Sequence, residues 1–221
     1  MPGTEQNYKK IIKEIRLYES APTLEGMERM GLKYKKNFGV SLINLKKIAE
    51  KYKPDKYLAE LLRNKGFRET IILSFMIDDI DKIQEKDISN ISKLLSTQEL
   101  AEQFVINILE KNKKFHPFAE KLILSDKEFQ ISAGFILYAR TALIDKEKDD
   151  AFFEAFFDKG FEYAFNNSIY IRKSAARAFR QVAMRNNNLK EKVIKIAEKI
   201  KKYDNPNANL VYEETLPLIK Y

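Results

Sequence analysis

The chain has 221 residues, of which 44% are hydrophobic, so it is long enough to bury a sizeable core. It contains no cysteine and one histidine, His116, which excludes disulfides, thiolate chemistry and a metal site built from several histidines. No stretch approaches the ~20 consecutive apolar residues of a transmembrane helix, and the N-terminal residues lack the apolar core of a secretory signal. We therefore expect a cytoplasmic protein that binds no membrane, metal or cofactor.

Helical periodicity recurs along the chain, and seven glycines with six prolines supply too little turn chemistry for a β protein. Start signals support three of the predicted helices: Ser41 precedes the third, Ser96 and Thr97 precede the seventh, and Asp126 precedes the ninth. No Ser/Gly-rich linker divides the chain, so we expect a single domain over residues 1–221. The predicted helices are 4–18, 23–31, 42–52, 55–64, 66–77, 88–95, 97–111, 115–124, 127–143, 148–163, 168–185 and 188–202, with a further candidate at 208–219.

From residue 88 onward the predicted helices come in pairs with a period of roughly 35 to 40 residues, namely 88–111, 115–143 and 148–185, closed by 188–219. Such pairs of antiparallel helices, each burying one face on its neighbours, indicate a HEAT-like α-solenoid, an armadillo-like helical architecture. An irregular helical bundle would have the same helices and is the alternative. The sequence therefore predicts an all-α fold.

The net charge of +8 is concentrated in residues 161–203, which hold eleven basic and three acidic residues, whereas the other 29 basic and 29 acidic residues cancel. Within this segment, two predicted helices each carry a row of cations opposite an apolar face. In a solenoid, such rows join on a basic concave face, as expected for binding a polyanion, most commonly a nucleic acid. A solvated face that only keeps the protein soluble is the alternative. The first row is Lys173, Arg177 and Arg180, and the second is Lys192, Lys195, Lys199 and Lys202.

Four longer stretches point to a family when they are taken in order. They are "YKKNFGVSLINLKKIAEKY", "LAELLRNKGFRETIILSFMIDD", "KLILSDKEFQISAGFILYA" and "YIRKSAARAFRQVAMRN". Together they resemble the DNA alkylation repair (AlkD-like) proteins, which are HEAT-like-repeat DNA glycosylases, and the resemblance covers residues 25–203. It implies an all-α solenoid, DNA as the partner, and excision of cationic alkylated purines as the family's activity.

The resemblance also implies where the catalytic carboxylate lies. Active family members carry a Trp-Asp-x-x-Asp stretch on the helix that corresponds to 97–111, where this chain reads "QELAE". Gln98 therefore replaces the tryptophan, Glu99 the first aspartate, and Glu102 the catalytic aspartate. A glutamate at 102 still supplies a carboxylate for an oxocarbenium ion, but from a side chain one methylene longer.

Other working positions of the family are altered as well, and the chain contains no tryptophan. An indole is the best ring for holding a cationic base, so its loss weakens base-directed chemistry. Tyr138 and Tyr170 are the candidates to replace the lost stacking surfaces. Ser132 stands at a family arginine, Leu122, Phe129 and Arg177 stand at family tryptophans, and Arg180 keeps a family arginine.

These residues predict a monomeric protein that grips the phosphate backbone of duplex or structured DNA, independently of sequence, with catalysis lost or weak. Five to seven phosphate contacts would give a slope of about −4.5 to −6 for log K against log salt. An active glycosylase that uses Glu102 is the first alternative, and a scaffold for an acidic protein is the second. The predicted DNA contacts are Lys173, Arg177, Arg180, Arg185, Lys192, Lys195 and Lys199.

Three other constellations favour structural roles. His116 is predicted in a loop that opens a helix, and the phenylalanines of 151–165 are predicted to pack in the core. The aspartates Asp78, Asp79 and Asp81 follow a helix end without the spacing of a metal site, so we expect a capped turn there.

Overall fold

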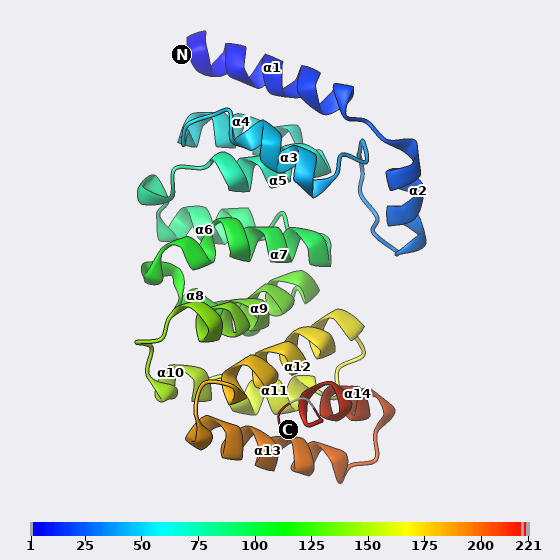
Figure 1. Cartoon of the computed structure of the whole chain (residues 1–221), viewed down its shortest axis with the longest axis vertical. Coiled ribbons are helices and arrows are strands. Elements are labelled where there is room, and N and C mark those ends of the chain that lie inside the picture. Colours follow the sequence, from blue (N-terminus) through cyan, green and yellow to red (C-terminus); the bar gives the residue numbers. More distant parts are fainter. Residues whose placement is uncertain (1, 218, 220–221) are drawn as a thin grey trace. The chain divides into compact units, whose positions relative to one another are not determined.

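The computed structural model describes residues 2–217 and 219, and these residues are helical with no β-strand among them (Figure 1). The all-α prediction is confirmed. Contacts within the chain define two compact units, Met1–Lys111 and Asn112–Tyr221. Whether the chain acts as one domain stays a prediction. Within the described ranges, every helix is too short or too polar to cross a lipid bilayer.

In the first unit, helix α5 is the buried centre. It packs against α3, α4 and α7, and nine of its ten residues are buried. This explains the run "IILSFMI", which is apolar on all sides because neighbours cover it on several faces. The helices are α1 (Pro2–Leu17), α2 (Ala21–Arg29), α3 (Leu42–Ala49), α4 (Lys56–Lys65), α5 (Arg68–Ile77), α6 (Glu85–Ser92) and α7 (Gln98–Asn107), with the 3₁₀ turns η1 (Ile80–Lys82) and η2 (Leu109–Lys111).

Side-chain caps set several helix starts in this unit. The side chains of Ser41 and Thr97 accept hydrogen bonds from the third backbone N–H of α3 and α7, as the sequence predicts. Asp55 caps α4 in the same way, and α4 ends at Gly66, whose φ of 72° is in the left-handed region that favours glycine.

In the second unit, α12 is the central helix. It packs against α9, α11, α13 and α14. Buried alanines alternate with bulkier residues along it, which allows these neighbours to approach closely. The helices are α8 (Phe118–Ile123), α9 (Glu128–Ile144), α10 (Asp150–Glu154), α11 (Phe157–Tyr163), α12 (Ile169–Ala183), α13 (Asn187–Lys201) and α14 (Pro206–Thr215), preceded by the 3₁₀ turn η3 (Lys113–Phe115).

The single helix predicted over 148–163 is wrong, because the chain forms α10 and α11 with a break between them. Phe153 and Phe156 are fully buried and Phe157 is nearly so. The i, i+3, i+4 spacing of these rings is that of one helical face, which is why the periodicity alone predicts a continuous helix. Gly160 lies against α12, where a Cβ would lie 2.6 Å from the ring of Phe179. The prediction that the phenylalanines of 151–165 pack in the core is confirmed for these three, whereas Phe152, Phe161 and Phe165 are half-buried.

Several other helix limits differ from the prediction; α6 starts at 85 rather than 88, and α7 ends at 107 rather than 111. Asp126 does not cap α9, whose N-cap is Lys127, and the N–H of Lys127 donates to the hydroxyl of Ser125 at 3.1 Å. The candidate helix at 208–219 corresponds to α14, which starts after the cap Asn205 and ends at Thr215. Residue 218 lies outside the described residues.

Candidate functional site

The stretch 98–102 opens helix α7, and its first turn is tied to α5 and to the loop before α3. Glu99 receives two hydrogen bonds from the guanidinium of Arg68, at 2.7 Å from Nε and 2.6 Å from Nη2. The hydroxyl of Tyr34 donates a third at 2.5 Å and lies 2.8 Å from the Oγ1 of Thr97, the cap of α7. Glu99 therefore joins three segments of the first unit.

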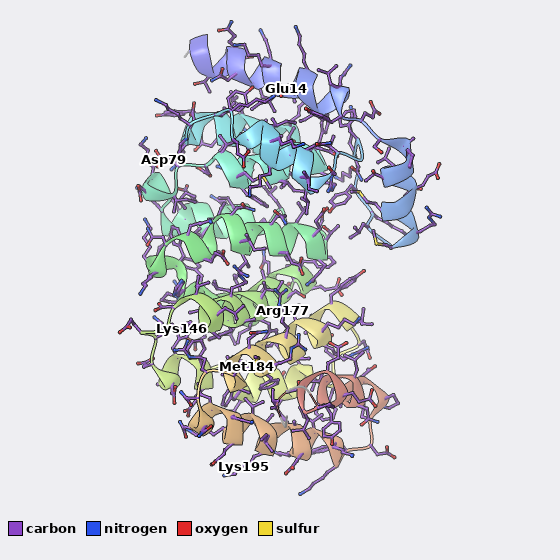
Figure 2. The ribbon with its side chains drawn as sticks, in the orientation of Figure 1. Glu14, Asp79, Lys146, Arg177, Met184 and Lys195 are labelled. Atoms are coloured by element: carbon purple, nitrogen blue, oxygen red, sulfur yellow. The ribbon has the colours of Figure 1, made fainter. Side chains whose placement is uncertain are left out.

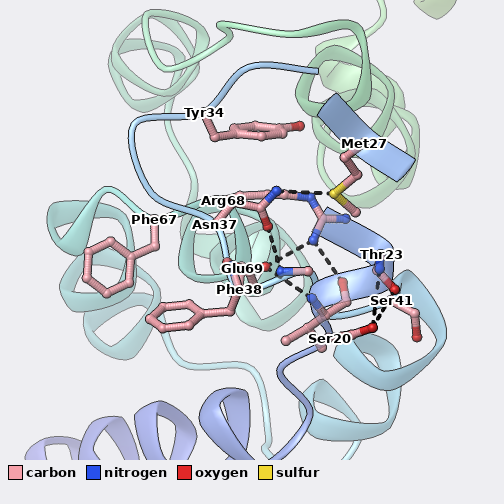
Figure 3. A network of polar contacts seen from close by, with 12 residues as sticks. Ser20, Thr23, Met27, Tyr34, Asn37, Phe38, Ser41, Phe67, Arg68 and Glu69 are labelled. Carbon is pink, nitrogen blue, oxygen red and sulfur yellow. Dashed lines mark hydrogen bonds and ion pairs between the residues drawn. The ribbon is translucent and has the colours of Figure 1, made fainter. Parts of the chain in front are cut away.

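The partner of Glu99 is a buried cation. Arg68 is only 1% exposed, and its Nη1 donates to the carbonyl of Val40 at 2.8 Å and lies 3.2 Å from Glu69. Figure 3 shows Arg68 between the ring of Tyr34 and Glu69. The guanidinium uses both of its edges in these contacts, so groups of the protein itself satisfy Arg68, whereas one carboxylate oxygen of Glu69, Oε2, is buried without a hydrogen-bond partner among the described residues.

Burial by itself disfavours a charged Glu99, but the hydrogen bonds and charge of Arg68, with the bond from Tyr34, outweigh it and hold the pKa of Glu99 below its ordinary value. Burial raises the pKa of the Tyr34 hydroxyl, and the negative charge of the neighbouring Glu99 is the second-largest cause of this increase. Glu99 is therefore charged at neutral pH, and Arg68 compensates that charge.

Gln98 and Glu102 lie on the same helix, one residue before and one turn after Glu99 respectively. Both side chains are half-buried, and both engage other groups of the protein. Glu102 is thus a partly accessible carboxylate on α7.

The second-unit residues that we expect to differ from the family pattern lie partly in the core and partly at the surface. Ser132 on α9 is fully buried, and its hydroxyl has no hydrogen-bond partner among the described residues. Leu122 on α8 is also buried. Tyr138 is fully buried, with its ring centroid 5.1 Å from that of Phe152 and 4.8 Å from that of Phe156. The suggestion that Tyr138 offers a stacking surface is wrong, because its ring belongs to the core.

Phe129 and Tyr170 form an aromatic pair where helices α9 and α12 begin. Their ring centroids are 5.4 Å apart, with the planes inclined at 55°. Both side chains are half-buried, so part of each ring reaches the surface. This pair places aromatic surface at the N-terminal end of α12.

Helix α12 has one accessible strip, which runs along the cations predicted from the sequence. Nine of its fifteen residues are buried, whereas Lys173 is exposed and Arg177 and Arg180 are half-buried. The strip borders α14: the Nζ of Lys173 lies 3.9 Å from a carboxylate oxygen of Glu214, and the Nη1 of Arg180 donates to the backbone carbonyl of Glu214 at 2.8 Å. Arg177 also engages protein groups.

Arg185, just beyond the C-terminal end of α12, is a structural clamp. Its two terminal nitrogens donate to four backbone carbonyls, one in the last turn of α9 and three in the segment that joins α9 to α10, at 2.7 to 3.4 Å. The guanidinium also lies 4.3 Å from the ring centroid of Phe153. These contacts occupy the guanidinium, so we do not include Arg185 in a DNA-binding surface. The four residues are Ala142, Asp145, Lys146 and Lys148.

The lysines of α13 face other neighbours. Lys192 forms a 2.6 Å ion pair with Glu154 of α10, and the Nζ of Lys199 lies 4.4 Å from the ring centroid of Phe161 in α11. Lys195 is exposed (Figure 2). The row on α13 therefore borders α10 and α11, whereas the row on α12 borders α14. A joint basic concave face stays a prediction.

His116 and the aspartates after α5 have structural surroundings. His116 is buried in the turn before α8, as predicted, and its Nδ1 lies 3.5 Å from Asp145. Asp78 ends α5 and pairs with Arg63 at 2.5 Å. Over the residues that the structure covers, no group of three or more histidine or carboxylate side chains could hold a metal ion.

Comparison with known proteins places the chain in a family. The family model of the DNA alkylation repair enzymes matches residues 11–208, which is most of the chain. The chain belongs to the DNA alkylation repair enzyme family. The resemblance read from the sequence is therefore confirmed.

A solved structure supports the fold of this DNA alkylation repair family member. It represents a new family of proteins related to the HEAT-like repeat DNA glycosylases with affinity for branched DNA structures. The two chains superpose with a TM-score of 0.78, over 94% of this chain and 93% of the other, at 18% sequence identity. No curated protein sequence matches.

Two of the positions that the sequence analysis expects to be altered have structural surroundings. Glu99 is held by Arg68, and Ser132 is enclosed in the core. Sequence reasoning missed Arg68 and Tyr34 as the groups that fix the start of α7. The available signal was the adjacent Arg-Glu pair that opens the apolar run "RETIILSFMI", since a charge there requires a partner.

Proposed function

We propose that this family member binds DNA through phosphate contacts from the accessible strip of α12, and that it excises alkylated bases weakly or not at all. The observation that carries the proposal is the strip itself. Lys173, Arg177 and Arg180 line the accessible side of a helix whose other sides are buried. Cations confined to one line can follow a phosphate backbone.

Two further observations support DNA as the partner. The chain's entire excess of positive charge lies in residues 161–203, which include α12 and α13. The structurally similar protein is described as having affinity for branched DNA. We therefore propose sequence-independent binding of duplex or branched DNA by a monomer, with Lys195 and Lys199 of α13 as additional contacts.

We infer weak catalysis from the residues that stand at, and next to, the positions where active family members carry their catalytic and base-binding groups. Excision requires a negative charge that stabilises the developing oxocarbenium ion, and the charge of Glu99 is already compensated by Arg68. Glu102 is the remaining carboxylate of the stretch, but no indole is present to hold a cationic base. At the tryptophan position that Arg177 occupies, a guanidinium repels such a base.

A binding titration by fluorescence anisotropy tests the first part. If three to five of these cations contact phosphates, log K against log salt should have a slope of about −2.7 to −4.5. The double variant Lys173→Gln/Arg177→Gln should lower the affinity for all duplex sequences. The matched control Lys9→Gln/Lys13→Gln removes two exposed lysines from α1 and should leave the affinity unchanged. A slope near zero would contradict the proposal and favour a scaffold for an acidic protein.

Single-turnover release of methylated purines tests the second part. We expect no release above background from the unaltered protein or from Glu102→Asp. Residues that act as a unit are non-additive, so only the combination with Arg177→Trp and Ser132→Arg is expected to restore activity. Because Ser132 is fully buried, circular dichroism must first show that the triple variant is folded. Robust release by the unaltered protein would show that Glu102 suffices for catalysis.

A further inference from the structure

A cationic cavity in the first unit shares only Tyr34 with the residues described so far. Its volume is about 690 Å³, and it is formed by α2 and the loop between α2 and α3. Three lysines and one glutamate line it, which gives a net charge of +2. The lining residues are Leu24, Glu28, Leu32, Lys33, Tyr34, Lys35, Lys36 and Asn37.

The loop that carries these lysines is held in one conformation by buried groups of α5. The N–H of Arg68 donates to the carbonyl of Lys36 at 3.1 Å. A carboxylate oxygen of Glu69 accepts from the N–H groups of Phe38 and Val40, at 3.0 and 3.3 Å (Figure 3). The cavity wall is therefore preorganised, so that binding a ligand does not require the loop to become ordered first.

The cations of this loop are not neutralised by the protein. Lys33 and Lys35 are exposed, and no ion pair to either occurs among the residues that the structure describes. Lys36 lies over aromatic rings, 4.2 Å from the centroid of Phe67 and 5.3 Å from that of Phe38. The positive potential of the loop is thus available to an anion.

The cavity also contains an aromatic ring that is fixed in place. The hydroxyl of Tyr34 is anchored to Glu99 and Thr97, so the ring cannot rotate away. Tyr34 is half-buried and contributes to the cavity wall. A fixed ring beside unpaired lysines is the combination that binds single-stranded nucleic acids, with the base on the ring and the phosphates on the cations.

We infer that this cavity takes an unpaired nucleotide of DNA, its base against Tyr34 and its flanking phosphates on Lys33 and Lys35. The volume lies within the roughly 300–1,000 Å³ of small-ligand pockets. Bases inside a duplex are stacked on one another and cannot reach the ring, so the site selects strand ends, gaps or branch points. This inference rests on the proposed function in one respect, namely that DNA is the partner.

The test compares a blunt duplex of two fully complementary strands with the same duplex carrying a short single-stranded overhang. The unaltered protein should prefer the overhang, and Lys33→Gln/Lys35→Gln should abolish the preference while the affinity for the blunt duplex is unchanged. Two lost contacts to a single strand correspond to a slope change of about 1.4, or about 25-fold in affinity at 0.1 M salt. The control Lys9→Gln/Lys13→Gln removes the same charge from the same unit and should keep the preference.

A second readout follows the base itself. A 2-aminopurine in the overhang should lose fluorescence when it stacks on Tyr34, and Tyr34→Phe, which keeps the ring but loses the hydroxyl that holds it, should retain part of that quenching. Tyr34→Leu should abolish it, and circular dichroism would show whether this variant is folded. If Tyr34→Leu is not folded, the overhang preference of Lys33→Gln/Lys35→Gln alone tests the inference.

Two outcomes would overturn the inference: equal losses on the blunt and overhang duplexes, or an overhang preference that survives the Lys33→Gln/Lys35→Gln change. Failure of the proposed function is distinguishable from either, because it is measured on the blunt duplex with the α12 variants.

Discussion

Replacing Glu99 with glutamine removes the charge that compensates Arg68 and leaves the shape of the side chain almost unchanged. Arg68 is 1% exposed and would retain only Glu69, at 3.2 Å from Nη1, as an anionic neighbour. Removing one partner of a buried ion pair typically costs 3–5 kcal/mol. Because Glu69 remains and glutamine still accepts a hydrogen bond, we expect a loss of about 3 kcal/mol in the free energy of unfolding.

Urea denaturation and thermal unfolding followed by circular dichroism measure this loss. For a chain of this length, about 3 kcal/mol corresponds to a decrease in Tm of roughly 6 to 12 °C. The loss should also depend on pH, because the folded-state pKa of Glu99 lies below its ordinary 4.5. The stabilisation is present above pH 4.5 and disappears as the pH falls through the lowered folded-state value, so the two proteins should converge in acid.

Two companion variants make this reasoning refutable. Glu191→Gln, an exposed glutamate on α13, is the control for a loss of charge alone and should change Tm little. Arg68→Met/Glu69→Gln/Glu99→Leu replaces the cation and both of its carboxylate neighbours by neutral groups and should be more stable than Glu99→Gln, because no buried charge is left without a partner. A loss below 1 kcal/mol for Glu99→Gln, or a difference that widens at low pH, would refute the ion-pair account.

Two other substitutions separate packing from binding. Arg185→Ala leaves four backbone carbonyls without this donor and should lower the free energy of unfolding by about 2 kcal/mol. The DNA affinity of the folded variant should stay within twofold of that of the unaltered protein. A large loss of affinity with unchanged stability would show that Arg185 contacts DNA. Gly134→Ala would place a Cβ 2.6 Å from a methyl of Ile123 and 2.7 Å from the carbonyl of Ala119, so α8 and α9 must separate at a cost of about 1–3 kcal/mol. An unchanged urea midpoint for Gly134→Ala would contradict the close packing of α8 on α9.

Much of the second unit could be predicted from local pattern. In α12, the residues Ile171, Ala175 and Phe179 recur with the helical period and are buried, whereas Lys173 and Arg177 lie on the accessible strip. The period alone separates these two sides, because neighbouring helices cover the apolar one. The start of α7 at Thr97 was equally predictable, since the hydroxyl bonds a backbone N–H only three residues further along the chain.

What sequence reasoning missed depends on residues that are distant in the chain. Arg68 and Glu99 are 31 residues apart, and Arg185 meets its carbonyl partners 37 to 43 residues earlier. Nothing in the local pattern indicates which acceptor such a cation meets. The break between α10 and α11 was not predictable from local pattern either, because the phenylalanines on both sides of it keep the spacing of one continuous helical face.

These distant contacts change how the net charge should be interpreted. Three of the seven cations predicted to bind DNA already contact groups of the protein. Arg185 donates to backbone carbonyls, Lys192 forms an ion pair with Glu154, and one nitrogen of Arg180 donates to a backbone carbonyl of α14. A cation already paired inside the protein releases few counterions from DNA, because it must first leave its partner. The salt dependence should therefore follow the accessible cations rather than the total charge, which is why the slope expected from the structure is shallower than the one expected from composition.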